Sequence, residues 1–433
     1  MPLRFPLLIL SALFGLTASV FAGLFGSGPE SVDLTGERWF PPITRQQSFS
    51  CSQQVALYYL FTAERNRNLQ QSSASPARRF SPYLAYSMLA GERTGRSHVV
   101  DGWILAREAG VPLEGDFPRY SRTLMHGYDR YLRAMKHRVK SWEILPVTDE
   151  RGISRAKELL ASGHPLACDF QIKGTLLRPL QTSGPRARER IVAQWGRTGP
   201  GHAMVYAGFD DSIGFDFNKD GRITNDVDLN GDGRISLIDH ERGAFLVVNP
   251  WGGAWGDRGR AWMPYRQHAA SKWPWSGSVA RVEVAPPYQP RLTLRLRMRA
   301  PNRQNIIVTA GNGKGRTVQP WMFSHFPATG GNGTLWDSLT SLRTPGPHLS
   351  PGSLAAPDGG PLETGHDLSA LGRSAGYSLE IRPARPGTLS GELIEAIFME
   401  YDTSGRLARE LPVTGFPLKL PASGGQWLTA GGR

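Results

Sequence analysis

The feature that most constrains the fold of this chain of 433 residues is the order of its hydrophobic patterns. Up to about residue 161 apolar residues recur at helical spacing, and afterwards they form short runs bounded by Gly and Pro, which are typical of strands. Helices followed by strands within about 250 residues predict an α+β domain with segregated lobes. Helices are expected at 55–65, 80–88, 100–109, 126–138 and 153–161, and strands at 165–172, 203–208 and 243–248.

A second architecture begins after Pro286 and Pro287, where the helical patterns largely end. Residues 292–298 alternate apolar and basic side chains, as in a strand with one exposed face. These short strands and turn-rich connections predict a C-terminal β-sandwich over 289–433, whose role the sequence does not reveal. Its other strands are expected at 305–310, 377–381 and 393–399, and the Pro-, Gly- and Ser-rich residues 344–366 are expected to form a long loop.

The first 22 residues have the pattern of a secretory signal peptide. Arg4 precedes an apolar run over 5–16, and the small residues Ala18 and Ala22 precede Gly23. The run is short for a membrane span, although an uncleaved anchor is an alternative, and no later stretch approaches the ~18 apolar residues of a transmembrane helix. The pattern predicts a secreted or periplasmic protein whose mature chain begins near Gly23.

Charge and cysteine content narrow the classes of function. The formal net charge of +13 favours an anionic cell-surface or wall polymer as a partner. The basic residues are dispersed and no nucleic-acid-binding module is visible, so no nucleic acid is expected as a partner. Two cysteines, Cys51 and Cys168, are too few to hold a secreted chain of this length together. Either they pair with each other, which would abolish thiol chemistry, or both are free.

Three segments carry residue types suited to nucleophilic catalysis. Cys51 stands just before a helical pattern, and the dipole at a helix N-terminus favours the thiolate. His202 follows a glycine turn at the start of a predicted strand. Asn249-Pro-Trp-Gly-Gly-Ala-Trp-Gly-Asp-Arg-Gly259 follows the next strand.

Together these segments resemble the papain family of cysteine peptidases, over about residues 36–285. The third segment matches the family's Asn-x-Trp-Gly-x-x-Trp-Gly-x-x-Gly pattern almost completely, and Cys, His and Asn follow one another in the expected order. The resemblance implies a two-lobed domain over 23–288, with a helical lobe plus a β-barrel-like lobe. It also implies a protein or peptide substrate and peptide-bond hydrolysis through an acyl-enzyme.

The same resemblance assigns roles to individual residues. Cys51 would attack the carbonyl as a thiolate, and His202 would pair with it and protonate the leaving group. Asn249 would fix the histidine tautomer, and Trp251 would cover the hydrogen bond between the two. Gln46 or Gln47, with the backbone N–H of Cys51, would stabilise the oxyanion.

The chain departs from the family pattern around the cysteine. The usual segment is Gln-Gly-x-Cys-Gly-Ser-Cys-Trp, whereas here there is one cysteine, no tryptophan after it, and a Gln46 that is one residue closer to it. In a rival alignment Gln54 takes the nucleophile's place and Cys51 that of the upstream structural cysteine. The chain would then be a catalytically inactive papain-fold protein that binds a surface. A third interpretation is an amidase or transpeptidase that acts on wall peptides with the same triad.

A calcium-loop insertion is expected over 211–243, between His202 and Asn249. Its second half fits the EF-hand pattern, ending in Asp as in dockerin-like loops: Asp228, Asn230, Asp232, Arg234, Ser236 and Asp239. Its first half begins in the same way: Asp216, Asn218, Asp220, Arg222 and Thr224. That half has Val227 at position 12, for which Asp226 or Asp228 is the expected substitute. The alternative is a polar, turn-rich loop. The expected role of Ca²⁺ is structural.

Overall fold

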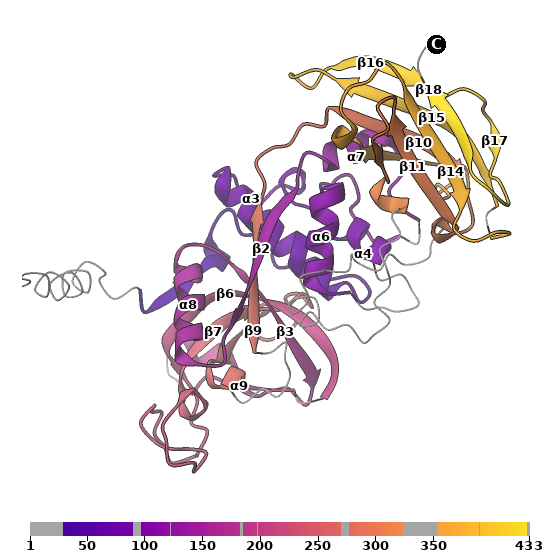
Figure 1. Ribbon diagram of the computed structural model, residues 1–433. Helices are drawn as coiled ribbons and strands as arrows, with labels where there is room; N and C mark the ends of the chain where they lie inside the picture. Colours follow the sequence, from indigo (N-terminus) through magenta and orange to yellow (C-terminus); the bar gives the residue numbers. More distant parts are fainter. Residues whose placement is uncertain are drawn as a thin grey trace, which may run out of the picture.

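The computed structural model describes residues 29–89, 97–121, 123–181, 185–196, 198–269, 277–323, 353–388 and 390–430 (Figure 1). The expected signal peptide lies outside these residues. In the described part of the chain, no helix is long and apolar enough to cross a membrane.

One helix that begins at Cys51 forms the centre of the helical lobe. It runs through α2 (Cys51–Gln53), a wider π-type segment η2 (Gln54–Phe61) and α3 (Thr62–Asn68). The run contains no Gly or Pro, so nothing in it interrupts the helix. Apolar side chains lie on every face, and all eight side chains of η2 are buried. The remaining helices are α4 (Tyr83–Leu89), α6 (Val99–Ala109), α7 (Tyr128–Ala134), α8 (Glu150–Ala161) and α9 (Arg266–Ala269). All five predicted helices are present, although the one expected at 126–138 is only seven residues long.

A nine-stranded sheet forms the second lobe of the same domain. Its strands, in spatial order, are β2 (Val139–Pro146), β9 (Ser278–Val284), β3 (Leu166–Lys173), β6 (Thr198–Gly214), β7 (Arg242–Val248), β8 (Arg260–Pro264), β5 (Arg190–Gln194) and β4 (Leu176–Pro179), with β1 (Ser31–Asp33) also paired to β6. The sheet is strongly bent (Figure 1), in keeping with the α+β, barrel-like lobe that was predicted. Among the described strands it does not close into a barrel, because its outermost strands, β2 and β4, do not pair.

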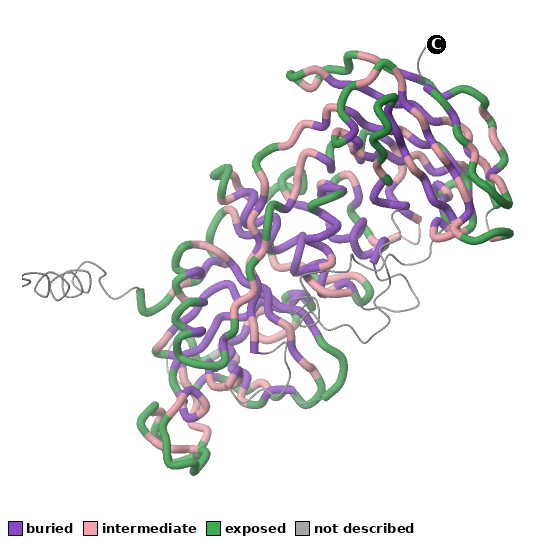
Figure 2. Tube along the Cα trace, in the orientation of Figure 1, coloured by how far each residue is buried: buried purple, intermediate pink, exposed green. Residues whose placement is uncertain are grey.

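The C-terminal part is a sandwich of two antiparallel sheets, as predicted. One sheet contains β13 (Leu362–Asp367), β10 (Leu292–Arg299), β15 (Glu392–Tyr401), β16 (Leu407–Pro412) and β17 (Leu418–Lys419). The other contains β12 (Thr317–Val318), β11 (Ile306–Asn312), β14 (Tyr377–Pro383) and β18 (Gln426–Ala430). The rings of Tyr377 and Phe398 stack between the two sheets with centroids 4.9 Å apart, and the facing sides of the strands are buried (Figure 2).

The prediction of a long loop over 344–366 is wrong at the C-terminal end of that range. Residues 362–366 belong to β13, which pairs with β10 along six residues. The Leu-Glu-Thr-Gly-His-Asp sequence carries little strand signal of its own, so the pairing partner determines its conformation. Residues 344–352 lie outside the described part of the chain.

Helix α7 joins the helical lobe to the sandwich (Figure 1). The Tyr128 hydroxyl lies 2.5 Å from Thr293 Oγ1 and 2.6 Å from the Tyr401 hydroxyl, and Arg138 forms an ion pair of 2.5 Å with Asp367. Helices α3, α4, α6 and α7 therefore lie between the bent sheet and the sandwich, whereas α8 and α9 lie beside the sheet (Figure 1). The insertion between β6 and β7 projects from the sheet lobe and is largely exposed (Figure 2).

Candidate active site

Cys51 is the first residue of α2 and lies against the strand that carries His202. Its half-buried sulfur accepts a hydrogen bond from the backbone N–H of Ala203, the residue after His202. Gln54 of the rival alignment is buried one turn further along, where its Nε2 donates to Thr44 Oγ1 at 3.0 Å. The helix thus presents the thiol, and not the amide of Gln54, to the His202 strand.

His202 and Asn249 form a buried hydrogen-bonded pair. Nε2 of His202 lies 2.9 Å from Oδ1 of Asn249, and both residues are at most 4% exposed. The same Oδ1 accepts the backbone N–H of Trp251 at 3.0 Å, which identifies it as the oxygen of the amide. His202 must then donate from Nε2, so in the neutral ring Nδ1 carries the lone pair that can accept a proton.

Trp251 covers this pair. Its ring centroid lies 4.7 Å from that of His202 with the planes 34° apart, while the indole itself remains 40% exposed. The glycines that follow allow the chain to fold back beneath it. A Cβ on Gly256 would lie 2.1 Å from the carbonyl oxygen of Arg260, and one on Gly259 would lie 2.6 Å from Ile43 Cγ2. Both glycines also have positive φ, which explains the Trp-Gly spacing of the motif.

The segment before Cys51 is joined to the segment after Asn249. The N–H of Gln46 donates to the carbonyl oxygen of Pro250 at 2.7 Å. The side chain of Gln46 donates to the Ser48 carbonyl at 3.0 Å, whereas Oε1 of Gln47 accepts the N–H of Tyr120 at 3.0 Å. The side-chain oxygen of Gln47 therefore holds a neighbouring loop, whereas Gln46 is attached to the Asn249 segment through its backbone and uses its amide nitrogen at Ser48.

Asp169 of β3 is a residue of this site that sequence reasoning missed. It pairs across the sheet with Ala203, and its carboxylate accepts the backbone N–H of His202. Its Oδ1 is buried without a hydrogen-bond partner, and a Cβ on Gly201 would lie 3.0 Å from that oxygen. No local signal marks Asp169, because only the pairing of β3 with β6 brings it to the site.

Burial opposes the expected activation of the thiol. Desolvation raises the pKa of Cys51; the Ala203 N–H lowers it in part, and the charge of Asp169 raises it further. Desolvation also lowers the pKa of His202, with the Asn249 hydrogen bond acting in the opposite direction. The shift of Cys51 runs opposite to the pKa lowering expected for a thiol at a helix N-terminus, and the two shifts favour the neutral forms of Cys51 and His202.

The two cysteines are free, so the disulfide alternative is excluded. Cys168 is 3% exposed and lies on β3 opposite Met204. Burial raises the pKa of its thiol well above the ordinary value, as expected for a small residue of the core.

The calcium-loop residues form two compact turns. Arg222 and Arg234 stand at the seventh positions, where the backbone carbonyl would be the ligand, and Ser236 Oγ donates to Asp239 at 3.2 Å. Asp226 is exposed and accepts the hydroxyl of Thr224. In the described residues no group of three or more His, Cys, Asp and Glu side chains is gathered closely enough to hold a metal. The donors are nevertheless all hard oxygens, which suits Ca²⁺, and Asp216 Oδ1 is buried without a hydrogen-bond partner.

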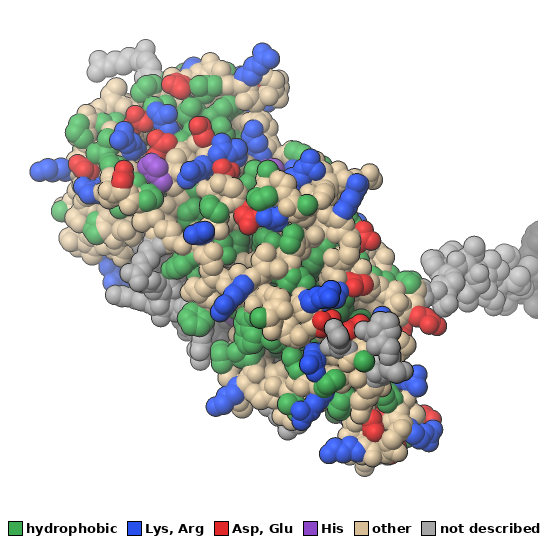
Figure 3. Space-filling view, turned by 180° about the vertical axis from the view of Figure 1, so that it is seen from behind, with side chains coloured by type: hydrophobic (Ala, Val, Ile, Leu, Met, Phe, Trp, Pro, Cys, Tyr) green, Lys and Arg blue, Asp and Glu red, His purple; other side chains and the backbone are tan. Residues whose placement is uncertain are grey.

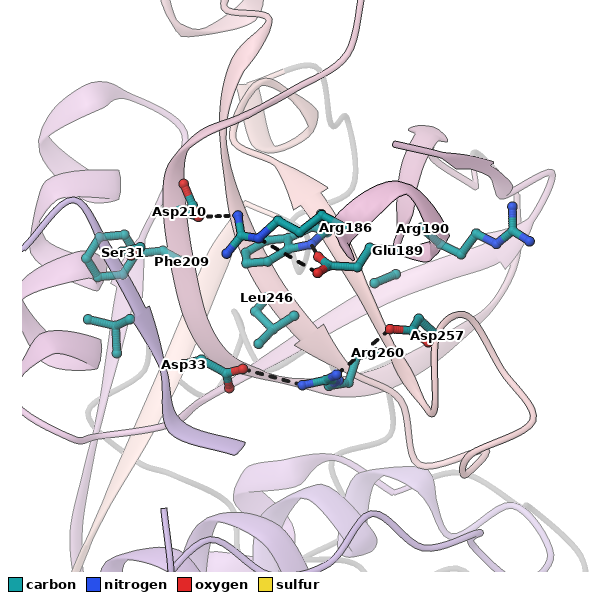
Figure 4. A pocket seen from close by; sticks show the side chains of 13 residues that line it. Ser31, Asp33, Arg186, Glu189, Arg190, Phe209, Asp210, Leu246, Asp257 and Arg260 are labelled. Atoms are coloured by element: carbon teal, nitrogen blue, oxygen red, sulfur yellow. Dashed lines mark hydrogen bonds and ion pairs between the residues drawn. The ribbon is translucent and has the colours of Figure 1, made fainter. Parts of the chain in front are cut away.

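A cavity of about 120 Å³ lies away from the thiol, between β1, β6 and β8 (Figure 4). Apart from Arg190, its charged side chains are paired with one another: Arg186 binds Asp210 at 2.6 Å, and Arg260 lies between Asp33 and Asp257 at 3.4 and 3.8 Å. On the face shown in Figure 3, Lys and Arg side chains are scattered among acidic ones. Neither feature marks a site for an anionic polymer.

The comparison with solved structures returns cysteine proteases, whereas no family model and no curated protein matches the chain. Xylellain, a cysteine protease from Xylella fastidiosa, is 18% identical over 61% of this chain and 88% of that one, with a TM-score of 0.38. Procathepsin L2 proteinase from Tenebrio molitor larval midgut is 14% identical over 60% of this chain and 70% of that one, also with a TM-score of 0.38. The proform of Amb a 11, a cysteine protease and major ragweed pollen allergen, is 14% identical over 61% and 67%, again at 0.38. These are papain-like cysteine proteases, the class that the motifs resemble, and at such scores the likeness adds no weight to the site itself.

Proposed function

We propose that this chain is a papain-like cysteine peptidase in which Cys51, His202 and Asn249 form the catalytic triad. The observation that carries the proposal is the buried pair of His202 and Asn249 under Trp251, next to a thiol bonded to the neighbouring Ala203 N–H. An oriented base beside a nucleophile at a helix start is the arrangement that acyl transfer requires.

The first proposed chemical step is a proton transfer from Cys51 to His202. In the proposed step the proton of the Cys51 thiol passes to Nδ1 of His202, and the sulfur attacks the substrate carbonyl. The S–C bond forms and the carbonyl oxygen becomes an oxyanion. As the oxyanion collapses back to a carbonyl, the C–N bond breaks and the proton passes from Nδ1 to the departing amine. Water hydrolyses the resulting acyl-enzyme by the same route. Gln46 or Gln47, with the Cys51 N–H, supplies the proposed oxyanion donors.

The test is thiol-dependent cleavage of casein by the full chain. Wild-type protein and the Cys168→Ala variant are expected to cleave, and iodoacetamide is expected to block both. Cys51→Ala is expected to be inactive, because no other thiol lies at the site. Cleavage that survives Cys51→Ala would refute the proposal.

Two other functions remain to be separated by experiment. A catalytically inactive, surface-binding protein would leave casein intact, and its Cys51 would react with iodoacetamide no faster than an ordinary thiol of the same pKa. A wall-peptide amidase or transpeptidase would release or exchange peptides on peptidoglycan while sparing casein. Cys51→Ala would abolish that activity as well, so the pair of substrates distinguishes the reactions.

We also propose that the protein acts after export, as the pattern of the first 22 residues suggests, and that Ca²⁺ binds the insertion as a structural ion. Aspartate, asparagine and hydroxyl oxygens would hold the ion, joined by the backbone carbonyls of Arg222 and Arg234. No catalytic step requires it. Its expected effect is on stability, measured as a rise in Tm when Ca²⁺ is added to chelated protein.

A further inference from the structure

The second calcium loop shows how its last residue closes it. Asp239 is fully buried, and its Oδ1 accepts the N–H groups of Leu229 and Asn230 at 3.0 and 3.2 Å. Its Oδ2 accepts the N–H of Ser236 at 2.9 Å. Asp239 therefore bonds to the second, third and ninth residues of a loop that begins at Asp228.

Glu241 makes the same contacts in the first loop, although it lies far outside the expected twelve residues. Its Oε1 accepts the N–H groups of Phe217 and Asn218 at 2.7 and 3.3 Å. Its Oε2 accepts the N–H of Thr224 at 3.1 Å. These are again the second, third and ninth residues, counted here from Asp216.

The opening residues of the two loops also correspond. Oδ2 of Asp216 accepts the N–H of Gly221 at 3.0 Å, and Oδ2 of Asp228 accepts that of Gly233 at 2.7 Å. In both loops the glycine is the sixth residue and has positive φ. Glu241 thus makes the same hydrogen bonds in the first loop that Asp239 makes in the second.

An independent feature points to a cation in the first loop. Oδ1 of Asp216 is buried and has no hydrogen-bond partner, which is costly for a carboxylate oxygen unless a cation is bound to it. Glu241 is only 2% exposed, and no ion pair within 4.0 Å is found for it among the described residues. Arg266, stacked on the Phe217 ring at 4.2 Å, acts on Glu241 only through longer-range electrostatics.

We propose that Glu241 is the closing ligand of the first calcium loop, in place of Asp226 or Asp228. The first loop then encloses the second, and the insertion takes two Ca²⁺ ions, not one. Glu241 directly precedes β7, and its carbonyl accepts the N–H of Phe215 just after β6 at 3.1 Å. Ions held there would clamp the ends of the two strands that position His202 and Asn249. The inference rests on the calcium binding proposed above and is independent of peptidase activity.

Calcium titration of the chelated full chain by calorimetry tests this proposal. Wild-type protein is expected to bind two Ca²⁺ ions per chain. Glu241→Gln and Asp216→Asn are each expected to bind one, or to bind the second at least tenfold more weakly. Asp226→Asn removes the neighbouring acid that local spacing favours, and is expected to keep both ions.

The contrary outcomes are distinct. If Glu241→Gln keeps both ions at wild-type affinity, or Asp226→Asn loses one, Glu241 is not the ligand. If wild-type protein binds a single ion that Asp239→Asn removes, only the second loop is a site. If it binds none, the calcium proposal fails as a whole. Circular dichroism checks that each variant is folded, and should Glu241→Gln fail to fold, Asp216→Asn decides between one ion and two.

Discussion

At the residue scale, the His202–Asn249 hydrogen bond determines which ring nitrogen carries the proton. Oδ1 of Asn249 is held by the Trp251 N–H, so it can only accept from Nε2. The short spacing between Asn249 and Trp251 makes this part of the site recognisable from sequence. The position of Cys51 is less evident from local pattern, because the residues around it differ from the family's usual segment.

Asn249→Ala is expected to lower kcat by roughly 10², because the ring loses the bond that fixes its tautomer. KM is expected to change little, since Asn249 is buried and therefore shielded from direct contact with a bound substrate. Steady-state kinetics on the peptide substrate provide the measurement. An unchanged kcat would mean that Asn249 does not orient the base.

Asp169→Asn is expected to make the Cys51 thiol more reactive. Burial raises the pKa of Asp169, so the effect belongs to the pH range in which Asp169 is ionised. There its negative charge raises the pKa of Cys51, and its removal lowers that pKa and increases the thiolate fraction at a given pH. The pH profile of iodoacetamide alkylation should therefore move to lower pH. Asp129→Asn, an exposed aspartate on α7, is the matched control and should leave the profile in place. A shift to higher pH in Asp169→Asn would contradict the assigned sign.

At the scale of elements, hydrophobic periodicity predicted the helices well and the strands in part. The run after Cys51 is apolar and free of Gly and Pro, so its helix follows from local sequence. β6 was expected over six residues and spans 17, because polar and glycine residues at both ends pair with β3 and β7. β13 was missed for the same reason: pairing with a distant strand overrides a weak local signal.

The contact between α7 and β13 depends on the absence of a side chain at Gly365. A Cβ there would lie 2.9 Å from Tyr131 Cβ and 3.0 Å from Tyr128 Cδ2. Gly365→Ala is expected to force these elements apart at a cost of about 1–3 kcal/mol of unfolding free energy. Thermal or urea unfolding measures it. Gly36→Ala is the control, since a Cβ there meets nothing within 4 Å and the residue lacks positive φ. Equal losses of unfolding free energy in the two variants would exclude the contact at Gly365 as the cause.

At the scale of the whole molecule, the sandwich core carries a histidine that makes stability depend on pH. His366 is fully buried and bonded to Thr364 Oγ1 at 2.9 Å. Burial lowers its pKa from 6.5 to about 3. Because the folded pKa is the lower one, its contribution is fully present above about pH 6.5 and is lost as pH falls toward 3.

His366→Gln is expected to flatten the acid side of the stability profile. Between about pH 6 and 4 the wild-type protein should lose unfolding free energy more steeply, by about 1.4 kcal/mol per pH unit for the one proton involved. Urea unfolding at several pH values measures the slopes, and carboxylates common to both proteins cancel in the difference. Parallel profiles would show that His366 does not titrate in this way.

Local sequence determined the features that depend on short spacing. These are the helices, the Asn249 motif with its glycines, the pattern of the second calcium loop, and the change from helices to strands after about residue 161. Tertiary structure decided what depends on contacts between distant segments: Asp169 beside Cys51, Glu241 against the loop at Asp216, and β13 as a strand. It also reversed the expected pKa shift of the thiol. A helix start is evident from sequence, but burial is a property of the folded chain, and desolvation is the largest cause of the raised pKa of Cys51.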